Sequence, residues 1–384
     1  MGSAATSTGL LDATVSYSGR PVLCGVTLLA GPGEVLAVLG PSGSGKTTAL
    51  RTVAGLHPVR SGRVLVAGRD VTGLPTPQRN VAMVFRDTTL VPFLDVAENL
   101  ARSAGAFGVP APEATRRVAA RSRLLGLARL LPRMPRTLSA GETGLTGVGR
   151  TLVRAPAAFL FDEPLAHLDP PERARTRRVI TDAVRRTGVG ALYVTHDQAE
   201  AMAVGDRLAV LREGRILQVD RPRRVYDRPA DVFVAGFVGS PGMGFLPARL
   251  VHTGGSAGFR IGPRTLPLWG PVPGELASCV GELVLLGLRA EDVTVAGPGA
   301  DPGSVAIPVV VRRVERLGRE AVVTAEVVLP GEADGASLAA RLPDGTQLRE
   351  GEHTEFAIDA RRAHVFDPVS ERAVLHPDGR HPAW

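Results

Sequence analysis

The sequence predicts an α/β domain built on a largely parallel β-sheet, followed by a smaller all-β domain. A short β-branched run at 34–39 leads through a glycine-rich loop into a helical segment at 48–54. Two later apolar runs, at 157–161 and 191–195, have the length and composition of buried parallel strands. From Phe245 onward, short alternating apolar segments separated by Gly and Pro indicate β-structure.

Length, charge and cysteine content limit the class of protein. At 384 residues the chain is longer than one typical core supports, so we expect two domains. The net charge is +7, but the arginines are spread along the chain and aromatic residues make up only 4%, so no stacking platform for nucleic acid is evident. Cys24 and Cys279 are the only cysteines and lie far apart, which favours a reducing cytosol over a disulfide framework or metal cluster. We therefore predict a cytoplasmic protein with no nucleic-acid partner.

The glycine-rich loop carries the strongest functional motif. Lys46 is the only lysine among the 45 Lys and Arg residues, so it occupies a position where arginine does not substitute. It lies in a full match to the P-loop pattern, in which backbone N–H groups and a helix N-terminus surround phosphate oxygens. A compact ammonium fits between the β- and γ-phosphates where a planar guanidinium does not. The loop, which we predict to bind ATP, consists of Gly40, Pro41, Ser42, Gly43, Ser44, Gly45, Lys46, Thr47 and Thr48.

Polar residues follow two other predicted strands of the same sheet. Asp162 and Glu163 come directly after the strand at 157–161, and His196 follows the strand at 191–195. We predict that Thr47 and Asp162 hold Mg²⁺, with Asp162 acting through water. Glu163 is then the carboxylate that polarises the water attacking the γ-phosphate, and the His196 imidazole contacts that phosphate.

In this order the motifs resemble the nucleotide-binding subunit of an ABC transporter. Tyr17 matches the aromatic residue that stacks on adenine in that family. The segment 161–169 matches the Walker B strand and the loop that meets the opposite subunit, and 194–202 matches the switch-histidine segment. The segments 205–229 and 233–241 are similar to the maltose- and trehalose-type importers of the carbohydrate uptake subfamily.

The resemblance implies an α/β P-loop NTPase fold. It assigns 1–240 to a nucleotide-binding domain with a RecA-like core and a helical subdomain at about 89–155, and 241–384 to a small all-β, OB-like regulatory domain. It also implies ATP and Mg²⁺ as cofactors. The implied partners are membrane-spanning permease subunits and a solute-binding protein, with the chain peripheral on the inner face of the cell membrane. Two ATPase subunits, alike or different, would sandwich two ATP molecules, and Asp169 would lie in the loop that meets the opposite subunit.

One departure from the family concerns the strand at 81–85. In the family this strand leads into a glutamine that contacts magnesium and the attacking water, and Arg86 stands in its place. A guanidinium has no acceptor and does not ligate Mg²⁺. We expect Arg86 to add positive charge beside the γ-phosphate and to misplace the water.

The other departure concerns the signature motif, normally Leu-Ser-Gly-Gly-Gln, which contacts the γ-phosphate held by the other subunit. Ala140 would cost about 1 kcal/mol if its backbone needs a positive φ. Glu142 forms a capping-box spacing with the serine but brings a carboxylate near phosphate. Here the motif continues after Leu138 as Ser139, Ala140, Gly141 and Glu142.

These observations favour the motor subunit of an importer for a carbohydrate or related polar solute, with slowed hydrolysis or altered coupling. The loop at 87–99 would contact the membrane partner. The alternative is a regulatory or scaffold subunit that binds ATP with little turnover. A soluble ABC ATPase of DNA repair or translation is a third interpretation, but the chain has a single P-loop and no sustained heptads.

Overall fold

The computed structural model describes residues 6–86, 89–253, 256–268, 272–297, 301, 303–343 and 345–377. The chain divides into two compact units, Met1–Pro222 and Arg223–Trp384. Residues 87 and 88, at the start of the loop predicted to contact a membrane partner, lie outside the described residues. No helix in the described part of the chain is long and apolar enough to cross a membrane.

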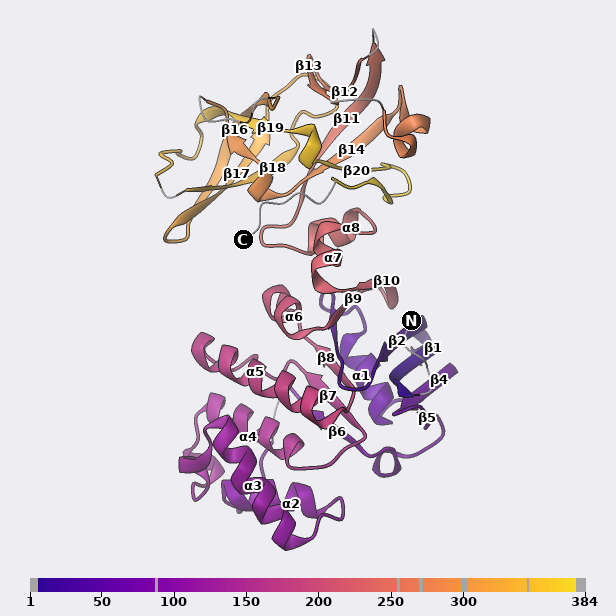
Figure 1. The fold of residues 1–384 in the computed structure, drawn as a ribbon, viewed down its shortest axis with the longest axis vertical. Helices are drawn as coiled ribbons and strands as arrows, with labels where there is room; N and C mark the ends of the chain where they lie inside the picture. Colours follow the sequence, from indigo (N-terminus) through magenta and orange to yellow (C-terminus); the bar gives the residue numbers. More distant parts are fainter. Residues whose placement is uncertain are drawn as a thin grey trace. The chain divides into compact units, whose positions relative to one another are not determined.

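The first unit contains a six-stranded sheet whose order is β10-β9-β3-β8-β7-β6 (Figure 1). All neighbours in it are parallel except β9 and β10. Every residue of β3, β7 and β8 is buried, as expected for strands covered on both faces. Because the strands are parallel, the carboxyl ends of β3, β6, β7 and β8 meet at one edge. The strands are β3 (Val35–Leu39), β6 (Val81–Val84), β7 (Ala158–Asp162), β8 (Ala191–Val194), β9 (Arg207–Arg212) and β10 (Arg215–Asp220).

A second, antiparallel sheet in this unit has the order β2-β1-β4-β5. One apolar cluster joins the two sheets through α1 (Lys46–Ala54), because Leu10, Val38 and Leu50 all belong to it. This packing fixes the start of α1 against both sheets. The strands of the second sheet are β1 (Thr8–Tyr17), β2 (Arg20–Ala30), β4 (Ser61–Val66) and β5 (Arg69–Asp70), and a short 3-10 helix, η2 (Thr76–Arg79), precedes β6.

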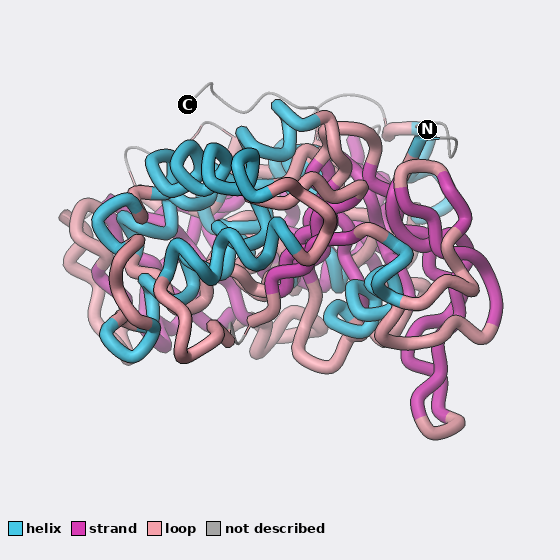
Figure 2. Tube along the Cα trace, turned by 90° about the horizontal axis from the view of Figure 1, so that it is seen from below, coloured by secondary structure: helices cyan, strands magenta, loops and turns pink. Residues whose placement is uncertain are grey.

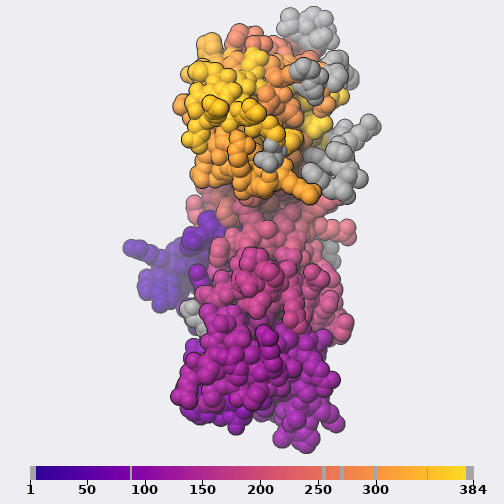
Figure 3. Space-filling model, turned by 90° about the vertical axis from the view of Figure 1, so that its left-hand side faces the viewer, coloured from indigo at the N-terminus to yellow at the C-terminus, as the bar shows by residue number. Residues whose placement is uncertain are grey.

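Three helices of the first unit form a layer of their own around residues such as Leu100 and Val118, which lie in one buried cluster. These helices are α2 (Val96–Gly105), α3 (Ala111–Leu125) and α4 (Ala140–Leu152), with η3 (Ala128–Leu130) and η4 (Pro135–Thr137) between the last two. They face the viewer as cyan tubes in Figure 2, and their surface is the violet end of Figure 3. The remaining helices of the unit are α5 (Pro170–Thr187) and α6 (Gln198–Val204).

The second unit is mainly antiparallel β-structure. Its two sheets have the orders β13-β12-β11-β14-β20-β21 and β15-β19-β16-β17-β18, and a single apolar core includes residues of both. The first sheet comprises β11 (Gly244–Thr253), β12 (Ser256–Ile261), β13 (Arg264–Pro267), β14 (Leu283–Leu288), β20 (His364–Phe366) and β21 (Ala373–Leu375). The second comprises β15 (Thr294–Val295), β16 (Val305–Arg316), β17 (Glu320–Val327), β18 (Ser337–Pro343) and β19 (His353–Ile358). Short 3-10 helices are η5 (Gly274–Cys279), η6 (Ala290–Asp292) and η7 (Ala360–Arg362).

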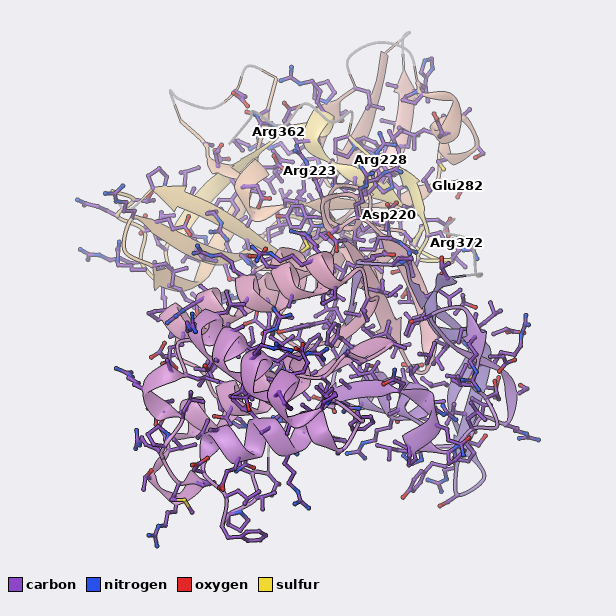
Figure 4. The ribbon with its side chains drawn as sticks, turned by 60° about the horizontal axis from the view of Figure 1, so that its bottom comes forward. Asp220, Arg223, Arg228, Glu282, Arg362 and Arg372 are labelled. Atoms are coloured by element: carbon purple, nitrogen blue, oxygen red, sulfur yellow. The ribbon has the colours of Figure 1, made fainter. Side chains whose placement is uncertain are left out.

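Charged side chains link the 3-10 turns of this unit. Arg362, labelled in Figure 4, lies 3.4 Å from Asp292 Oδ1 and 2.9 Å from Asp301 Oδ2. Arg372, also labelled, pairs through its backbone with Asp231, the residue that caps α8.

The all-β fold predicted for the tail is confirmed, and the two linked sheets give it a barrel-like form.

The two compact units divide between Pro222 and Arg223, and the domain division at 240/241 stays a prediction. The helices α7 (Pro222–Asp227) and α8 (Val232–Phe237) cluster with the second unit. Arg289 contributes to this packing, because its guanidinium is buried over the ring of Tyr226 at 3.9 Å and donates to the carbonyl oxygens of Tyr226 at 2.7 Å and Ala235 at 3.1 Å. Burial lowers the pKa of Arg289, and nearby carboxylates oppose that effect.

Candidate functional site

The glycine loop between β3 and α1 depends on its glycines for different reasons. Gly43 and Gly45 adopt φ values of +80° and +105°, which favour glycine. At Gly40, a Cβ would lie 2.1 Å from the carbonyl oxygen of Leu211, so no larger residue fits against β9. The loop therefore brings its backbone close to the start of α1, where the helix dipole favours an anion.

Two polar side chains in this loop fit a phosphate group. Lys46 is largely buried, and its Nζ donates to the carbonyl oxygens of Gly40 at 2.8 Å and Pro41 at 2.9 Å. Burial lowers the pKa of Lys46, while the charges of Glu163 and Asp162 oppose that shift. Ser44 Oγ is buried and has no hydrogen-bond partner among the described residues. A buried hydroxyl without a partner is costly in a protein alone, and a phosphate oxygen would satisfy it.

The end of β7 lies directly beside this loop. Thr47 Oγ1 donates to Asp162 Oδ1 at 3.1 Å, so the two residues predicted to hold Mg²⁺ are brought together. Burial raises the pKa of Asp162, and the hydrogen bond from Thr47 acts against that shift. The part of the chain that is described contains no cluster of three or more His, Cys, Asp or Glu able to hold a metal. One carboxylate and one hydroxyl fit Mg²⁺, which usually keeps waters and shares substrate phosphates rather than occupying an all-protein cage.

Glu163 lies between residues from two neighbouring strands. Its carboxylate oxygens lie 3.1 Å from His196 Nδ1 and 3.4 Å from Arg86 Nε. Its backbone has φ of +47°, rare for a residue with a side chain and typical of strained functional positions. The three side chains line a cavity of about 340 Å³, so β6, β7 and β8 each deliver one of them to the same place.

The signature residues form the start of α4. Ser139 is the N-cap, accepting from the Glu142 N–H at 3.1 Å, and the Glu142 carboxylate accepts from the Ser139 N–H at 2.9 Å. Arg133 Nη1 lies 3.3 Å from that carboxylate, which offsets its negative charge. Ala140 is the first helical residue and is not among the described residues with positive φ. The cost of about 1 kcal/mol that a positive φ would impose on alanine is therefore absent. A Cβ at Gly141 would lie 3.1 Å from Glu172 Oε2, which makes this position tight.

The remaining predicted residues lie at the periphery. Tyr17, at the end of β1, is 63% exposed and meets the ring of His57 edge-on at 5.6 Å. An exposed aromatic ring is free to stack on a planar ligand. Asp169 caps α5 by accepting from the Glu172 N–H at 2.9 Å, which fixes the loop that follows Glu163.

Arg173 is a site residue that the sequence did not single out. Its guanidinium lies 3.3 Å from Asp197 Oδ2 and donates to the carbonyl oxygen of Leu168 at 3.2 Å. It therefore joins the loop after Glu163 to the residue that follows His196. The one feature of the sequence that could have indicated Arg173 is its position one helical turn after Asp169. Many exposed arginines lie one turn after the start of a helix, so this feature is not specific.

A glycine-rich loop that can hold phosphate, beside two carboxylates at the end of the parallel strand β7, defines the class of P-loop nucleotide hydrolases. A family model described as "ABC transporter" matches residues 23–166, and one described as "TOBE domain" matches residues 286–366.

The relatives that match extend over almost the whole chain. The sn-glycerol-3-phosphate import ATP-binding protein UgpC of Paracoccus denitrificans (strain Pd 1222) is 41% identical over 95% of this chain and 98% of its own length. The trehalose/maltose import ATP-binding protein MalK of Thermococcus litoralis is 39% identical over 89% of this chain and 92% of its own. The sulfoquinovosyl glycerol transport ATP-binding protein SmoE of Agrobacterium fabrum is 38% identical over 94% of this chain and 97% of its own.

Solved structures agree with this assignment. An ATP-binding subunit of an ABC transporter is 27% identical, with a TM-score of 0.53 over 57% of this chain and 92% of the other. A dimeric ATP-binding cassette bound to ADP and Pi is 25% identical, with a TM-score of 0.52 over 56% of this chain and 99% of the other. The chain belongs to the ATP-binding subunits of ABC transporters, and the predicted family and fold are confirmed.

Proposed function

We propose that this chain is the ATP-hydrolysing motor subunit of an importer for a carbohydrate or a related polar solute. The single observation that carries the catalytic part is the meeting of the Thr47–Asp162 pair with the Glu163–His196 pair at one sheet edge. The relatives named for glycerol phosphate, trehalose/maltose and sulfoquinovosyl glycerol import support the solute class.

The residues have distinct roles in this proposal. The glycine loop and Lys46 bind the ATP phosphates, while the exposed Tyr17 ring stacks on adenine. Thr47 and Asp162 hold Mg²⁺, which when bound neutralises phosphate charge. Glu163 accepts a proton from the attacking water, and its contact with His196 positions both side chains at the γ-phosphate.

Two ATPase subunits, identical or related, form the working unit of this proposal. The Ser139 cap presents the N-terminus of α4 to the γ-phosphate bound by the opposite subunit, as a helix dipole favours. Arg133 beside Glu142 reduces the repulsion that a carboxylate would exert there. The further partners are membrane-spanning subunits and a solute-binding protein, and the chain lies on the inner face of the membrane.

ATP turnover by the purified full-length chain is the measurement that tests this function. We expect phosphate release that depends on Mg²⁺ and stops on chelation, because Thr47 and Asp162 are placed to hold the ion directly or through water, and the bound ion neutralises phosphate charge. Binding of ATP without Mg²⁺-dependent turnover, even after assembly with membrane subunits, would favour the alternative of a regulatory or scaffold subunit.

One observation favours slow hydrolysis. Arg86 replaces the glutamine of the resembled family, and its Nε lies 3.4 Å from Glu163 Oε2. The guanidinium occupies one oxygen of the Glu163 carboxylate, so it competes with the attacking water for that oxygen. Arg86 contacts one carboxylate oxygen of Glu163 and His196 contacts the other, so the two residues together fix the orientation of the carboxylate.

Replacing Arg86 with glutamine is therefore expected to raise basal turnover about threefold to tenfold, as loss of one partly exposed ion pair suggests. Steady-state phosphate release under saturating ATP measures this, with Arg116→Gln as a matched control because Arg116 is an exposed residue of α3 paired with Glu113 of the same helix. Equal or lower turnover in Arg86→Gln would show that the arginine does not restrain the base.

A further inference from the structure

A buried carboxylate lies behind the proposed catalytic residues and has no role in the chemistry described so far. Glu200, in α6, is 5% exposed and lines the same cavity of about 340 Å³ as Glu163 and His196. Two hydroxyl groups donate to it, Tyr193 Oη to Oε1 and Thr195 Oγ1 to Oε2 at 3.4 Å. Burial raises the pKa of Glu200, and the hydrogen bond from Tyr193 opposes that shift. Burying a carboxylate carries a free-energy cost that an apolar residue would avoid, so the contacts of Glu200 have to offset it.

Those contacts fix the turn that carries His196. Thr195 Oγ1 accepts from the Asp197 N–H at 3.0 Å while it also donates to Glu200. Asp197 Oδ1 accepts from the Glu200 N–H at 2.9 Å, and this bond caps α6. The residues on either side of His196 are therefore bonded to each other and to Glu200, which leaves the backbone of the turn little freedom.

The ring of His196 depends on that backbone for its direction. Its side chain is 58% exposed, and its Nδ1 lies 3.1 Å from Glu163 Oε1. The position of a ring so exposed is set mainly by the backbone that carries it, because few packed neighbours limit its movement. A small rotation of the turn would move the ring away from Glu163.

Further contacts extend this network to the loop after β7. The Arg173 guanidinium, from α5, lies 3.3 Å from Asp197 Oδ2 and donates to the carbonyl oxygen of Leu168 at 3.2 Å. The turn that Glu200 fixes is therefore joined, through Asp197 and Arg173, to the loop that follows the proposed base.

We propose that Glu200 is a positioning residue for ATP hydrolysis, whose buried carboxylate sets the direction of His196 toward Glu163. This proposal rests on the proposed function and deepens it by naming the group that positions its histidine. In this role Glu200 does not contact the nucleotide and acts through the turn alone. Its loss therefore lowers kcat and leaves ATP affinity, which the glycine loop supplies, in place.

Tyr193→Phe is the central test, because it removes one hydroxyl donor of Glu200 and keeps the buried ring. We expect kcat to fall about tenfold with KM for ATP within about twofold, since a displacement of about 1 Å at a reacting group costs up to roughly 100-fold in rate. Phosphate release by the full-length chain over a range of ATP concentrations measures both constants.

Tyr226→Phe is the matched control. Tyr226 Oη also donates to a carboxylate, that of Glu291, but both residues belong to the second unit. We expect kcat of this variant to stay within about twofold of the wild type.

Two further positions test the same network. Thr195→Val keeps the shape of the side chain and removes the hydroxyl, so we expect kcat about tenfold lower, while Thr195→Ser is expected to restore most of that loss. Glu200→Ala removes the carboxylate itself and is expected to lower kcat at least as much as Tyr193→Phe. If circular dichroism melting shows that Glu200→Ala does not fold, the variants of the two donors carry the test.

A double-mutant cycle separates positioning of His196 from a merely structural role. In the His196→Ala background the residue to be positioned is absent, so adding Tyr193→Phe is expected to change the rate by less than about twofold. Single-turnover phosphate release measures the rate of both variants. A further fall as large as that seen in the wild-type background would overturn the proposal, as would unchanged kcat in Tyr193→Phe or a loss of ATP affinity that parallels the loss of kcat.

Failure of this proposal is distinguishable from failure of the proposed function. Mg²⁺-dependent turnover that Tyr193→Phe and Thr195→Val leave unchanged would keep the motor function and reject the role of Glu200. Absence of ATP binding by the wild type would reject the proposed function, and with it the reaction that Glu200 is proposed to serve.

Discussion

Replacing Lys46 with alanine is expected to lower ATP affinity about 100-fold, because charged hydrogen bonds each contribute about 1.5–3 kcal/mol and an ammonium contacts more than one phosphate oxygen. In the structure the Lys46 Nζ is already directed to the inside of the glycine loop, bonded to the carbonyl oxygens of Gly40 and Pro41. Binding of a fluorescent ATP analogue to the purified chain measures the change.

A charge-conserving variant makes this test sharper. Lys46→Arg keeps the positive charge but replaces a compact ammonium with a planar fork, so we expect it to bind ATP almost as poorly as Lys46→Ala. Circular dichroism melting of each variant checks that the fold is retained. ATP affinity close to that of the wild type in both variants would contradict a phosphate-binding role for the loop.

Replacing Glu163 with glutamine is expected to lower ATP turnover about 100-fold to 10,000-fold while leaving ATP binding in place. Glutamine has nearly the same shape but does not accept a proton from the attacking water. Its side chain can still contact His196, so the local structure is largely preserved. Single-turnover phosphate release, measured beside equilibrium ATP binding, separates the chemical step from affinity.

Glu332→Gln serves as the matched control, because Glu332 is an exposed carboxylate of the second unit and its ion-pair partner is Arg249. We expect its turnover to stay within about twofold of the wild type, as for an exposed substitution. Turnover retained in Glu163→Gln would assign the base to another group and remove the basis for a restraint by Arg86.

The parts of the fold that could be predicted from the sequence are those with a local signal. The apolar runs form β3, β7 and β8, and because parallel strands end at one edge, the pattern of residues alone places Asp162 and His196 near the glycine loop. The capping box of Ser139 and Glu142 could likewise be predicted, because the two residues lie three positions apart in the sequence.

Contacts between distant side chains could not be predicted in this way. Arg173 is set apart from many other arginines only by its partner Asp197, which lies 24 residues away in sequence. The packing of α7 and α8 with the second unit involves Arg289, more than 50 residues further along the chain. At Ala140 the helix begins directly after the Ser139 cap, so this residue has a helical backbone and needs no glycine. In each case side-chain reach or backbone conformation decides the outcome, and neither is visible in a pattern of residue types.

The burial of Lys46 has a practical consequence for chemical labelling. Its amine is the only lysine side-chain amine in the sequence, and it is 7% exposed with a pKa lowered by burial. Amine-reactive dyes and cross-linkers therefore have a single lysine target, located inside the nucleotide loop rather than on the surface. The extent of acylation at Lys46, read by mass spectrometry, becomes a footprint of nucleotide occupancy that needs no engineered label.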